Sequence, residues 1–387
     1  MTADEHRGFI SHLGKFANRD VVHVGGLSQR PAHACGVSVS HPAKPLRIAV
    51  VASLVTPLQP AQLGGAQAFL CDLAIGLSRR GHEVLVYCAE GSEVPGVDLV
   101  EIPVAPGADQ ALMMPGSRDE PAASPVMRRA LELLFKELRR VGADVVSQHA
   151  FDAEAIELSD GLPVLHTLHM PPISNRVLNE VLKSRGAFAT VSESCRRAWA
   201  AAGAAQVSVL RNGVPVFTVD EVPIREEALL AGRLSPEKGF EDGIAAARAI
   251  GLRPVVVGVP YDPSYQLDLS AALVLPPQPR SRLWQLMAGA KVTLLPVHWD
   301  EPFGLVCAEA QMAGCPVAGY SRGGLVEIVE PGVSGFLSEP GDVKALAEAA
   351  QAATKLDRAG VRASAVQRLG LDASLDAYEA ALAAVAV

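Results

Sequence analysis

Residues 301–317 read EPFGLVCAEAQMAGCPV, and this stretch decides how the rest of the chain is interpreted. Two carboxylates, Glu301 and Glu309, stand in it with seven residues between them. The residues from 305 to 313 are good helix formers, and the glycine and proline that follow end the pattern. The spacing therefore predicts Glu301 on a loop before a helix and Glu309 within that helix, both facing a common cleft.

The turn between the two carboxylates suits a polar ligand. Pro302 and Gly304 leave backbone N–H groups exposed at the start of the predicted helix, where an anion or a sugar hydroxyl can be held. A carboxylate accepts hydrogen bonds from two neighbouring hydroxyls, which both the hexose and the ribose of a nucleotide-sugar offer. An ordinary helix with one capping and one solvent-facing glutamate is the alternative that this stretch leaves open.

Composition limits the class of protein. The 387 residues are enough for two domains, and 49% of them are hydrophobic but only 5% aromatic, which favours an α/β protein. A formal net charge of −8, without a long run of Lys or Arg, argues against nucleic-acid binding. No apolar stretch reaches the roughly 18 residues that span a bilayer, so no integral membrane segment is predicted; peripheral membrane contact is left open.

The six cysteines show no C-x-x-C spacing, and several fall within apolar segments. This pattern is typical of reduced, buried side chains rather than of disulfides or zinc ligands. We therefore expect a cytoplasmic protein.

Alternating strand and helix patterns divide the chain into two halves. Residues 1–44 show no sustained periodicity and are expected to be a disordered extension, whereas residues 45–213 predict a first Rossmann-like domain. After a linker at 214–225, residues 226–365 repeat the alternation, and a C-terminal helix at 366–387 is expected to return to the first domain. The predicted fold is α/β, with two Rossmann-like, doubly wound domains facing across a cleft.

A basic turn opens the second half. Residues 232–239 read GRLSPEKG after a strand and before a helix, so Arg233 and Lys238 can point at one spot near a helix N-terminus. Two cations and helix N–H groups suit a diphosphate, although a solvated basic turn is the alternative. The Gly64–Gly65 pair is a weaker signal, because glycine loops of this kind are common; it would let the backbone approach the same phosphate or sugar.

Histidines lie at strand ends of the first half, the edge where doubly wound sheets bind ligands. His169 stands where its strand must stop, before two prolines, and is expected to face the cleft. His149 ends the preceding strand, and both histidines are candidates for the acceptor side. His166 is expected to point into the packing.

Missing motifs narrow the chemistry. The chain has no G-x-G-x-x-G, which counts against a dinucleotide oxidoreductase. No Asp-x-Asp follows a strand, so no metal site is predicted, and the cation clamp would take the metal's place. No cofactor is predicted either.

Together these stretches resemble the retaining glycosyltransferases of the two-domain GT-B fold with an E-x7-E signature, glycosyl transferases group 1 or family 4. The C-terminal pieces are the more specific ones. The matching stretches, in the family's order, are the Gly64–Gly65 loop, His169 at its strand end, ATVSES (189–194), VLRNGV (209–214), AGRLSPEKG (231–239), EPFGLVCAEAQMAGCPV (301–317) and GGLVEIVEPGVSGFL (323–337).

The resemblance implies that the first domain binds an acceptor and the second a nucleotide-sugar donor. Arg233 and Lys238 would hold the donor diphosphate, and Glu309 the ribose hydroxyls. Gly65 would lie over the phosphates, and His169 beside the sugar and the reacting centre.

The donor sugar itself would be held by the E-x7-E loop. The implied contacts are the Glu301 carboxylate and the backbone at Phe303, Gly304 and Leu305.

The implied reaction moves a sugar from a nucleoside-diphosphate sugar to a hydroxyl of a small molecule or glycan, with retention and no protein nucleophile. UDP-sugar is the first expectation for this co-substrate and GDP-sugar the second. The segments at 255–266 and 273–284, which would bind the base, are shorter than the family's, so they leave the identity of the base open. A sugar-nucleotide epimerase, a phosphorylase on the same fold and a catalytically silent sugar-binding relative are the alternatives.

Overall fold

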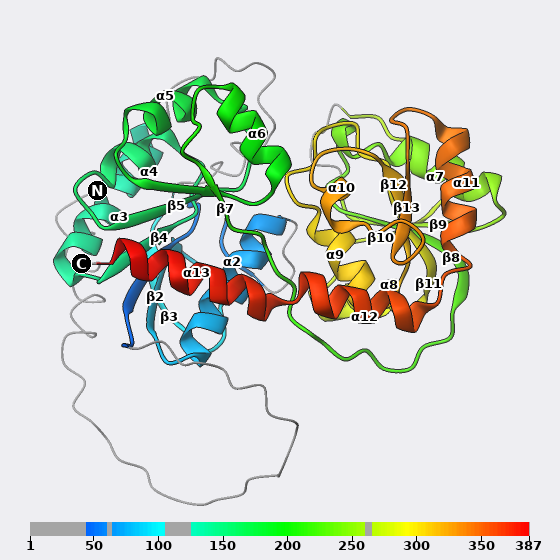
Figure 1. The fold of residues 1–387 in the computed structure, drawn as a ribbon, viewed down its shortest axis with the longest axis horizontal. Coiled ribbons are helices and arrows are strands. Elements are labelled where there is room, and N and C mark those ends of the chain that lie inside the picture. Colours follow the sequence, from blue (N-terminus) through cyan, green and yellow to red (C-terminus); the bar gives the residue numbers. More distant parts are fainter. Residues whose placement is uncertain (1–43, 60–63, 105–124, 260–264, 387) are drawn as a thin grey trace, which may run out of the picture. The chain divides into compact units, whose positions relative to one another are not determined.

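The computed structural model describes residues 44–59, 64–104, 125–259 and 265–386. The predicted extension at 1–44 therefore lies outside the described residues, apart from Lys44. The described chain contains two parallel β-sheets, each covered on both faces by helices (Figure 1).

The first sheet has the strand order β3-β2-β1-β4-β5-β6-β7 within the described residues, and its strands pair in parallel. The sequence did not predict β3. The strands are β1 (Arg47–Val51), β2 (Glu83–Ala89), β3 (Asp98–Ile102), β4 (Val145–Gln148), β5 (Val164–Leu168), β6 (Ala187–Thr190) and β7 (Ser208–Val209).

Strand β1 shows why its sequence is a continuous hydrophobic run rather than an alternation of hydrophobic and polar residues. Ile48 and Val50 pack on one face with α2 (Gly65–Arg79) and α13 (Leu371–Val385). Ala49 and Val51 pack on the other face with α3 (Pro125–Val141). Successive side chains of a strand point to opposite faces, so both faces need apolar residues.

The remaining helices of the first half surround β5 and β6. They share a separate core in which Trp199 is fully buried. These helices are α4 (Ala153–Leu158), α5 (Asn175–Lys183) and α6 (Glu193–Ala201).

The second sheet repeats the plan with the order β10-β9-β8-β11-β12-β13, again parallel. Helices α7 and α11 cover one face, and α8, α9 and α12 pack on the other. The strands are β8 (Arg225–Ala231), β9 (Arg253–Val257), β10 (Leu273–Leu275), β11 (Ala290–Leu295), β12 (Val317–Tyr320) and β13 (Gly335–Ser338). The helices are α7 (Phe240–Ala249), α8 (Arg280–Gly289), α9 (Leu305–Met312), α10 (Leu325–Ile328), α11 (Val343–Ala353) and α12 (Arg358–Leu369), with a 3-10 turn, η2, at Pro236–Lys238.

Both sheets reverse their strand order once, between β1 and β4 and between β8 and β11. Ligands of doubly wound sheets bind beyond the carboxyl ends of the strands at such a reversal. The predicted α/β fold with two doubly wound sheets is confirmed. The reversals also lie where His149 and the 232–239 turn leave their strands.

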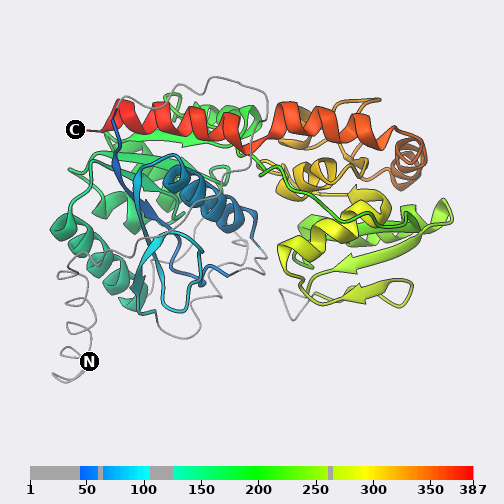
Figure 2. The same ribbon diagram turned by 90° about the horizontal axis from the view of Figure 1, so that it is seen from below.

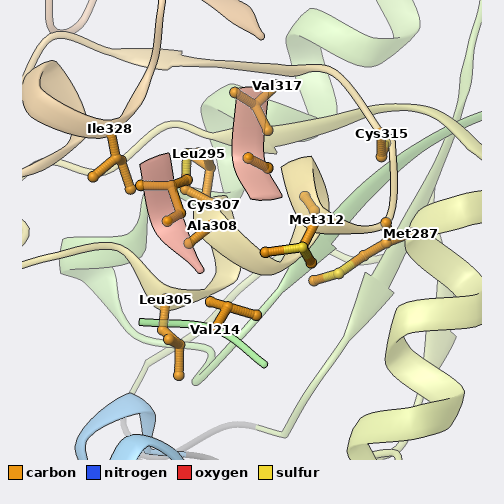
Figure 3. Close-up of a cluster of buried hydrophobic side chains, with 14 of the residues drawn as sticks. Val214, Met287, Leu295, Leu305, Cys307, Ala308, Met312, Cys315, Val317 and Ile328 are labelled. Atoms are coloured by element: carbon orange, nitrogen blue, oxygen red, sulfur yellow. The ribbon is translucent and has the colours of Figure 1, made fainter. Parts of the chain in front are cut away.

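Helix α9 is buried along almost its whole length. Figure 3 shows Leu305, Cys307, Ala308 and Met312 of this helix among side chains of the surrounding elements, with Val214 nearby. A helix that is apolar on all sides is held from all sides. Glu309 therefore extends from a helix whose position is fixed by packing.

The chain crosses between the halves at two places that lie side by side. The Val214 N–H donates to the Leu369 carbonyl (2.8 Å), and the Leu371 N–H donates to the Val214 carbonyl (2.9 Å). Between these bonds Gly370 has extended dihedrals and separates α12 from α13. The C-terminal helix that packs on the first sheet thus begins at Leu371, after the break, rather than at 366 (Figures 1 and 2).

We predict that Gly213→Ala destabilises the protein by about 1–3 kcal/mol, because added atoms in a packed site must displace their neighbours. A Cβ on Gly213 would lie 2.6 Å from the Leu371 Cα and 3.0 Å from the Gly370 carbonyl oxygen. Urea denaturation measures the change. Gly360→Ala is the control, since it lies inside α12 where alanine favours the helix; equal stability of the two variants would contradict the prediction.

Candidate active site

Two helix N-termini meet at the site. Helices α2 and α9 begin after Gly64 and Gly304, and neither receives a side-chain cap. A Cβ on Gly65 would lie 3.3 Å from the Leu305 Cβ, so the two first residues are in contact distance. The first N–H groups of a helix have no partner inside it and carry partial positive charge. This arrangement can hold an anion between the two helix ends.

A pocket that is open to solvent lies at this meeting point. Its lining comes from both halves of the chain. The lining residues are Gly64, Gly65, Ala68, Ala231, Gly232, Val257, Pro277, Gln278, Arg280, Leu283, Leu305, Val306 and Glu309.

Lys238 and Glu301, which the sequence assigned to phosphate and sugar, are brought together. Lys238 Nζ lies 2.7 Å from Glu301 Oε2, and both side chains are largely buried. The Trp299 indole N–H donates to the same oxygen (2.8 Å), and the Lys238 ammonium lies 5.1 Å from the centre of the Trp299 ring. Trp299 thus holds both charged groups, and Oε1 is the Glu301 oxygen that these two bonds leave unused.

Arg233 follows β8 in the same turn as Lys238. Its guanidinium lies 3.6 Å from the Glu237 carboxylate, four residues on along the chain. Glu237 also accepts a hydrogen bond from the Ser235 hydroxyl (2.6 Å). The left-handed Gly239 (φ 62°) ends η2 and starts α7, which gives the turn its tight form.

The loop that carries Glu301 is shaped by two glycines. A Cβ on Gly323 would lie 2.4 Å from the Glu301 nitrogen, and one on Gly324 would lie 2.7 Å from the Pro302 carbonyl oxygen. The Gly324 N–H donates to the Glu301 carbonyl at 2.6 Å. Only residues without a Cβ allow this approach, so Gly323 and Gly324 fix the conformation of the loop that carries Glu301.

Glu309 has a partner that the sequence did not predict. Its Oε1 accepts from Arg280 Nε (2.5 Å), while Arg280 Nη1 lies 2.6 Å from Asp72 Oδ2 on α2. All three side chains are largely buried. Arg280 is therefore a bridge between a carboxylate on α2 and one on α9, at the wall of the pocket.

Arg280 and Trp299 were both missed for a physical reason. Their importance comes from contacts between distant segments, and the sequence shows only their neighbours. One signal was present: Arg280 is the first residue of α8, where a cation opposes the helix dipole. Such a placement indicates that the residue is there for another partner.

The two candidate histidines are buried and adjacent. His149 Nδ1 lies 2.9 Å from His169 Nε2, and Ser147 Oγ lies 2.8 Å from His149 Nε2. Burial and the neighbouring His169 hold the pKa of His149 well below its usual value, and burial lowers the pKa of His169 to about 4. Both rings are neutral near pH 7. His149, predicted on the acceptor side, has both ring nitrogens engaged within the protein.

His166 lies apart from this pair, as expected. Its ring stacks on Phe188 with a centroid distance of 4.6 Å.

Within the described ranges, no three His, Cys, Asp or Glu side chains are grouped so that they could hold a metal ion. None of the helices in these same ranges combines the length and the apolar character needed to cross a bilayer.

Solved structures share the arrangement of this chain. HepE from Anabaena, in complex with UDP-glucose, has a TM-score of 0.69 at 21% identity and covers 88% of this chain and 100% of its own. Sucrose-phosphate synthase from Thermosynechococcus elongatus has a TM-score of 0.69 at 19% identity, covering 87% of this chain and 99% of its own. Two doubly wound sheets with a pocket lined from both of them are the arrangement of the GT-B fold.

Family models agree with this class. The model for glycosyl transferases group 1 matches residues 221–365, and that for glycosyltransferase family 4 matches residues 63–216. D-inositol 3-phosphate glycosyltransferase from Nocardia farcinica is 27% identical over 398 residues, covering 85% of this chain and 87% of that protein. Glycogen synthase from Mycobacterium tuberculosis is 26% identical over 368 residues, covering 82% and 89%. The chain belongs to the group 1 glycosyltransferases, and the predicted transferase class is confirmed.

The Asp72 carboxyl gives a pH-dependent prediction. Burial raises its pKa from 3.8 to about 6, although Arg280 opposes the rise. Between these values the folded protein binds more protons than the unfolded chain, so stability due to Asp72 falls as pH rises. We expect the free energy of unfolding of Asp72→Asn, compared with that of the parent protein, to rise by roughly 1–3 kcal/mol between about pH 4 and pH 7.

Thermal unfolding of both proteins across this pH range checks the prediction. The exposed Asp98 supplies a control, Asp98→Asn, whose difference from the parent should stay nearly constant. The prediction would be contradicted if the stability difference between Asp72→Asn and the parent were also constant, or if it came to favour the parent as pH rises.

Proposed function

We propose that the chain is a metal-independent, retaining glycosyltransferase that uses a nucleoside-diphosphate sugar, with UDP-sugar as the first donor to test. The observation that carries the proposal is the meeting of two uncapped helix N-termini at a pocket lined by Glu309, with Glu301, ion-paired to Lys238, on the loop before α9. The similar HepE structures are complexes with UDP-glucose and with UDP, which supports a UDP-sugar.

The diphosphate would lie between the N-termini of α2 and α9. Lys238 and Arg233 supply two cations beside the N–H groups, which together balance a charge of about −2. In the ligand-free protein both cations contact carboxylates, Glu301 and Glu237. A bound diphosphate would take over these cations, and Trp299 would keep Glu301 in place when Lys238 turns away.

The two carboxylates would divide the donor between them. Glu301, on the loop before α9, would offer Oε1, which Lys238 and Trp299 leave unused, to hydroxyls of the transferred sugar. The backbone N–H groups at Phe303, Gly304 and Leu305 would bind the same sugar. Glu309, inside α9 and at the pocket wall, offers the oxygen not bound by Arg280 to the ribose. A carboxylate with one oxygen already fixed presents the other in a defined direction.

The reaction would proceed on one face of the sugar. The bond between the anomeric carbon and the β-phosphate oxygen breaks, and a bond from the acceptor hydroxyl oxygen to that carbon forms on the same side. The hydroxyl proton passes to the leaving phosphate oxygen, giving the glycoside and the nucleoside diphosphate. Lys238, Arg233 and the helix N–H groups would stabilise the charge that grows on the phosphate, which is the role a metal ion has in other transferases.

Transfer of radiolabelled glucose tests this function. UDP-glucose and GDP-glucose would be offered separately with a panel of polyol phosphates, glucans and simple glycosides, and the product anomer read by NMR. An α-glycoside from an α-linked donor supports retention. A β-product contradicts retention, and conversion of the donor without an acceptor would point to an epimerase instead.

We predict that Lys238→Ala and Arg233→Ala each lower turnover by about two to three orders of magnitude, because each removes about 3–4 kcal/mol of stabilisation from the departing diphosphate. Lys291→Ala is the matched control, since Lys291, near the start of β11, forms an ion pair with Glu226, near the start of β8, away from the carboxyl ends of the strands. Initial-rate kinetics at saturating donor measure the effect. Turnover near that of the parent in both variants would refute the proposal that Lys238 and Arg233 hold the diphosphate.

The Glu301→Gln and Glu309→Gln variants should differ in their affinity for the nucleotide. Glu309→Gln loses a charge-assisted bond to the ribose of roughly 1.5–3 kcal/mol and should weaken binding of UDP alone. Glu301→Gln should bind UDP normally but lose turnover, because its ligand is the sugar. Calorimetric titration of each variant with UDP decides between these roles; weakened binding in Glu301→Gln alone would reverse the assignment.

A chelator should leave activity largely unchanged, because protein cations hold the diphosphate. The transfer assay with and without EDTA measures this. Loss of activity that magnesium or manganese restores would show a metal requirement and overturn the metal-independent proposal.

A further inference from the structure

One carboxylate joins three segments of the second half of the chain. Asp242 lies in the first turn of α7, and its Oδ2 accepts a hydrogen bond from the Tyr320 hydroxyl at 2.6 Å. The same oxygen lies 3.3 Å from His298 Nε2, and the rings of His298 and Tyr320 are 5.7 Å apart. Tyr320 ends β12 and His298 follows β11. Segments that are distant in the sequence therefore meet at one oxygen atom.

Each of these segments supports a charged residue of the proposed donor site. The turn at 236–239, directly before α7, carries Lys238, and the loop at 296–304, after β11, carries Glu301. The stretch that follows β12 contains Gly323 and Gly324, which fix the conformation of that loop. The three joined segments are therefore those that set where the Lys238 ammonium and the Glu301 carboxylate lie.

The turn and the loop also touch directly, at one place. The His298 N–H donates to the Glu237 carbonyl at 2.8 Å. A Cβ on Gly239 would lie 2.0 Å from the Pro296 carbonyl oxygen and 2.9 Å from the His298 ring, so the two backbones approach as closely as glycine permits. Two segments joined at one place can still rotate about it. The Asp242 carboxylate adds a second connection, which includes the end of β12.

The bond between Tyr320 and Asp242 is well supported by its surroundings. Tyr320 is 0% exposed, and a buried hydroxyl needs an acceptor, which Asp242 supplies. Burial and the hydrogen bond to Asp242 raise the pKa of Tyr320 above its usual value, so its hydroxyl keeps the proton that it donates. A carboxylate in the first turn of α7 is also stabilised by the helix dipole. Asp242 is therefore a firm connection between these segments.

We propose that Asp242 is a positioning residue which, through Tyr320 and His298, fixes the spacing between the Lys238 turn (236–239) and the Glu301 loop (296–304). Asp242 touches no substrate itself. The importance of this spacing for sugar transfer rests on the proposed function, in which Lys238 holds the diphosphate and Glu301 the sugar of one donor. The dependence of the spacing on Asp242 does not rest on that function.

The spacing has different consequences for a whole donor and for its nucleotide. The sugar and the diphosphate of a donor are joined by one covalent bond, so both can be held correctly only if Lys238 and Glu301 are the right distance apart. A nucleoside diphosphate has no sugar for Glu301 to hold, so its binding does not depend on this distance. Loss of Asp242 should therefore slow sugar transfer while leaving the affinity for UDP unchanged.

Trp299 reports the spacing without any assay of activity. Its indole N–H donates to Glu301 at 2.8 Å, and its ring centre lies 5.1 Å from the Lys238 ammonium. The chain has 3 tryptophans, so ¹H–¹⁵N spectra of the ¹⁵N-tryptophan-labelled protein are simple, and Trp299→Phe identifies the signal. We expect Asp242→Ala to shift the Trp299 indole signal and to leave the other two in place. An unchanged Trp299 signal in folded Asp242→Ala would overturn the proposal.

Kinetics and UDP titration test the consequence for transfer. Asp242→Ala should lower kcat with UDP-glucose about tenfold, the effect of losing one hydrogen bond to a charged group, with an unchanged Kd for UDP. Asp242→Asn keeps an oxygen that can accept from Tyr320 and should restore most of the activity, whereas Tyr320→Phe should reduce it. Asp357→Ala is the control, because the Asp357 carboxylate accepts from N–H groups of its own helix, α12. A parent-like kcat in Asp242→Ala, or an equal loss in UDP binding, would contradict the positioning role.

A double-mutant cycle separates positioning from a general structural role. If Asp242 acts through the spacing, Asp242→Ala should lower kcat less in the Glu301→Gln variant than in the parent, because the contact to be positioned is already weakened there. An equal loss in both proteins would show a structural role only and refute the proposal. If the parent transfers no sugar, the proposed function fails, and the Trp299 signal still decides the role of Asp242. If Asp242→Ala does not fold, Tyr320→Phe takes its place in each measurement.

Discussion

The approach of two helix N-termini, at Gly65 and Leu305, is the constraint on which the site depends. Two partial positive charges face one another there without side-chain caps, and Lys238 and Arg280 add full charges nearby. Such a concentration is unfavourable unless anions balance it. In the described protein Asp72, Glu301 and Glu309 supply the balance, so an anionic ligand would have to take over part of the role of these carboxylates.

This balance depends on how firmly the two helices are held. Helix α9 is enclosed by the second sheet and its neighbouring helices, and the glycines at 323 and 324 lock the loop before it. Helix α2 is held by the first sheet and by α13. Because a packed helix does not shift easily, its terminal N–H groups keep their direction, and preorganised dipoles stabilise charge at little cost during a reaction.

The sequence predicted those parts of the molecule that follow from local patterns. The strand and helix alternation gave both sheets, and the helix formers after Gly304 placed Glu309 in a helix and Glu301 before it. Contacts between distant segments were not predictable: Arg280 with Asp72, and His149 with His169, depend on which strands and helices become neighbours. Strand β3 was missed because its DLVEI pattern carries two charges at an edge position.

The place of α13 has a consequence for biosynthesis. Its Leu375, Tyr378 and Leu382 are part of the first domain's core, yet they are synthesised only after every strand of the second sheet. The first half is therefore made long before the helix that covers one face of its sheet, and until then that face stays partly open to solvent. Domains usually mature in the order of their synthesis. Here the second can finish first, and the exposed face of the first needs protection in a nascent chain until α13 has left the ribosome.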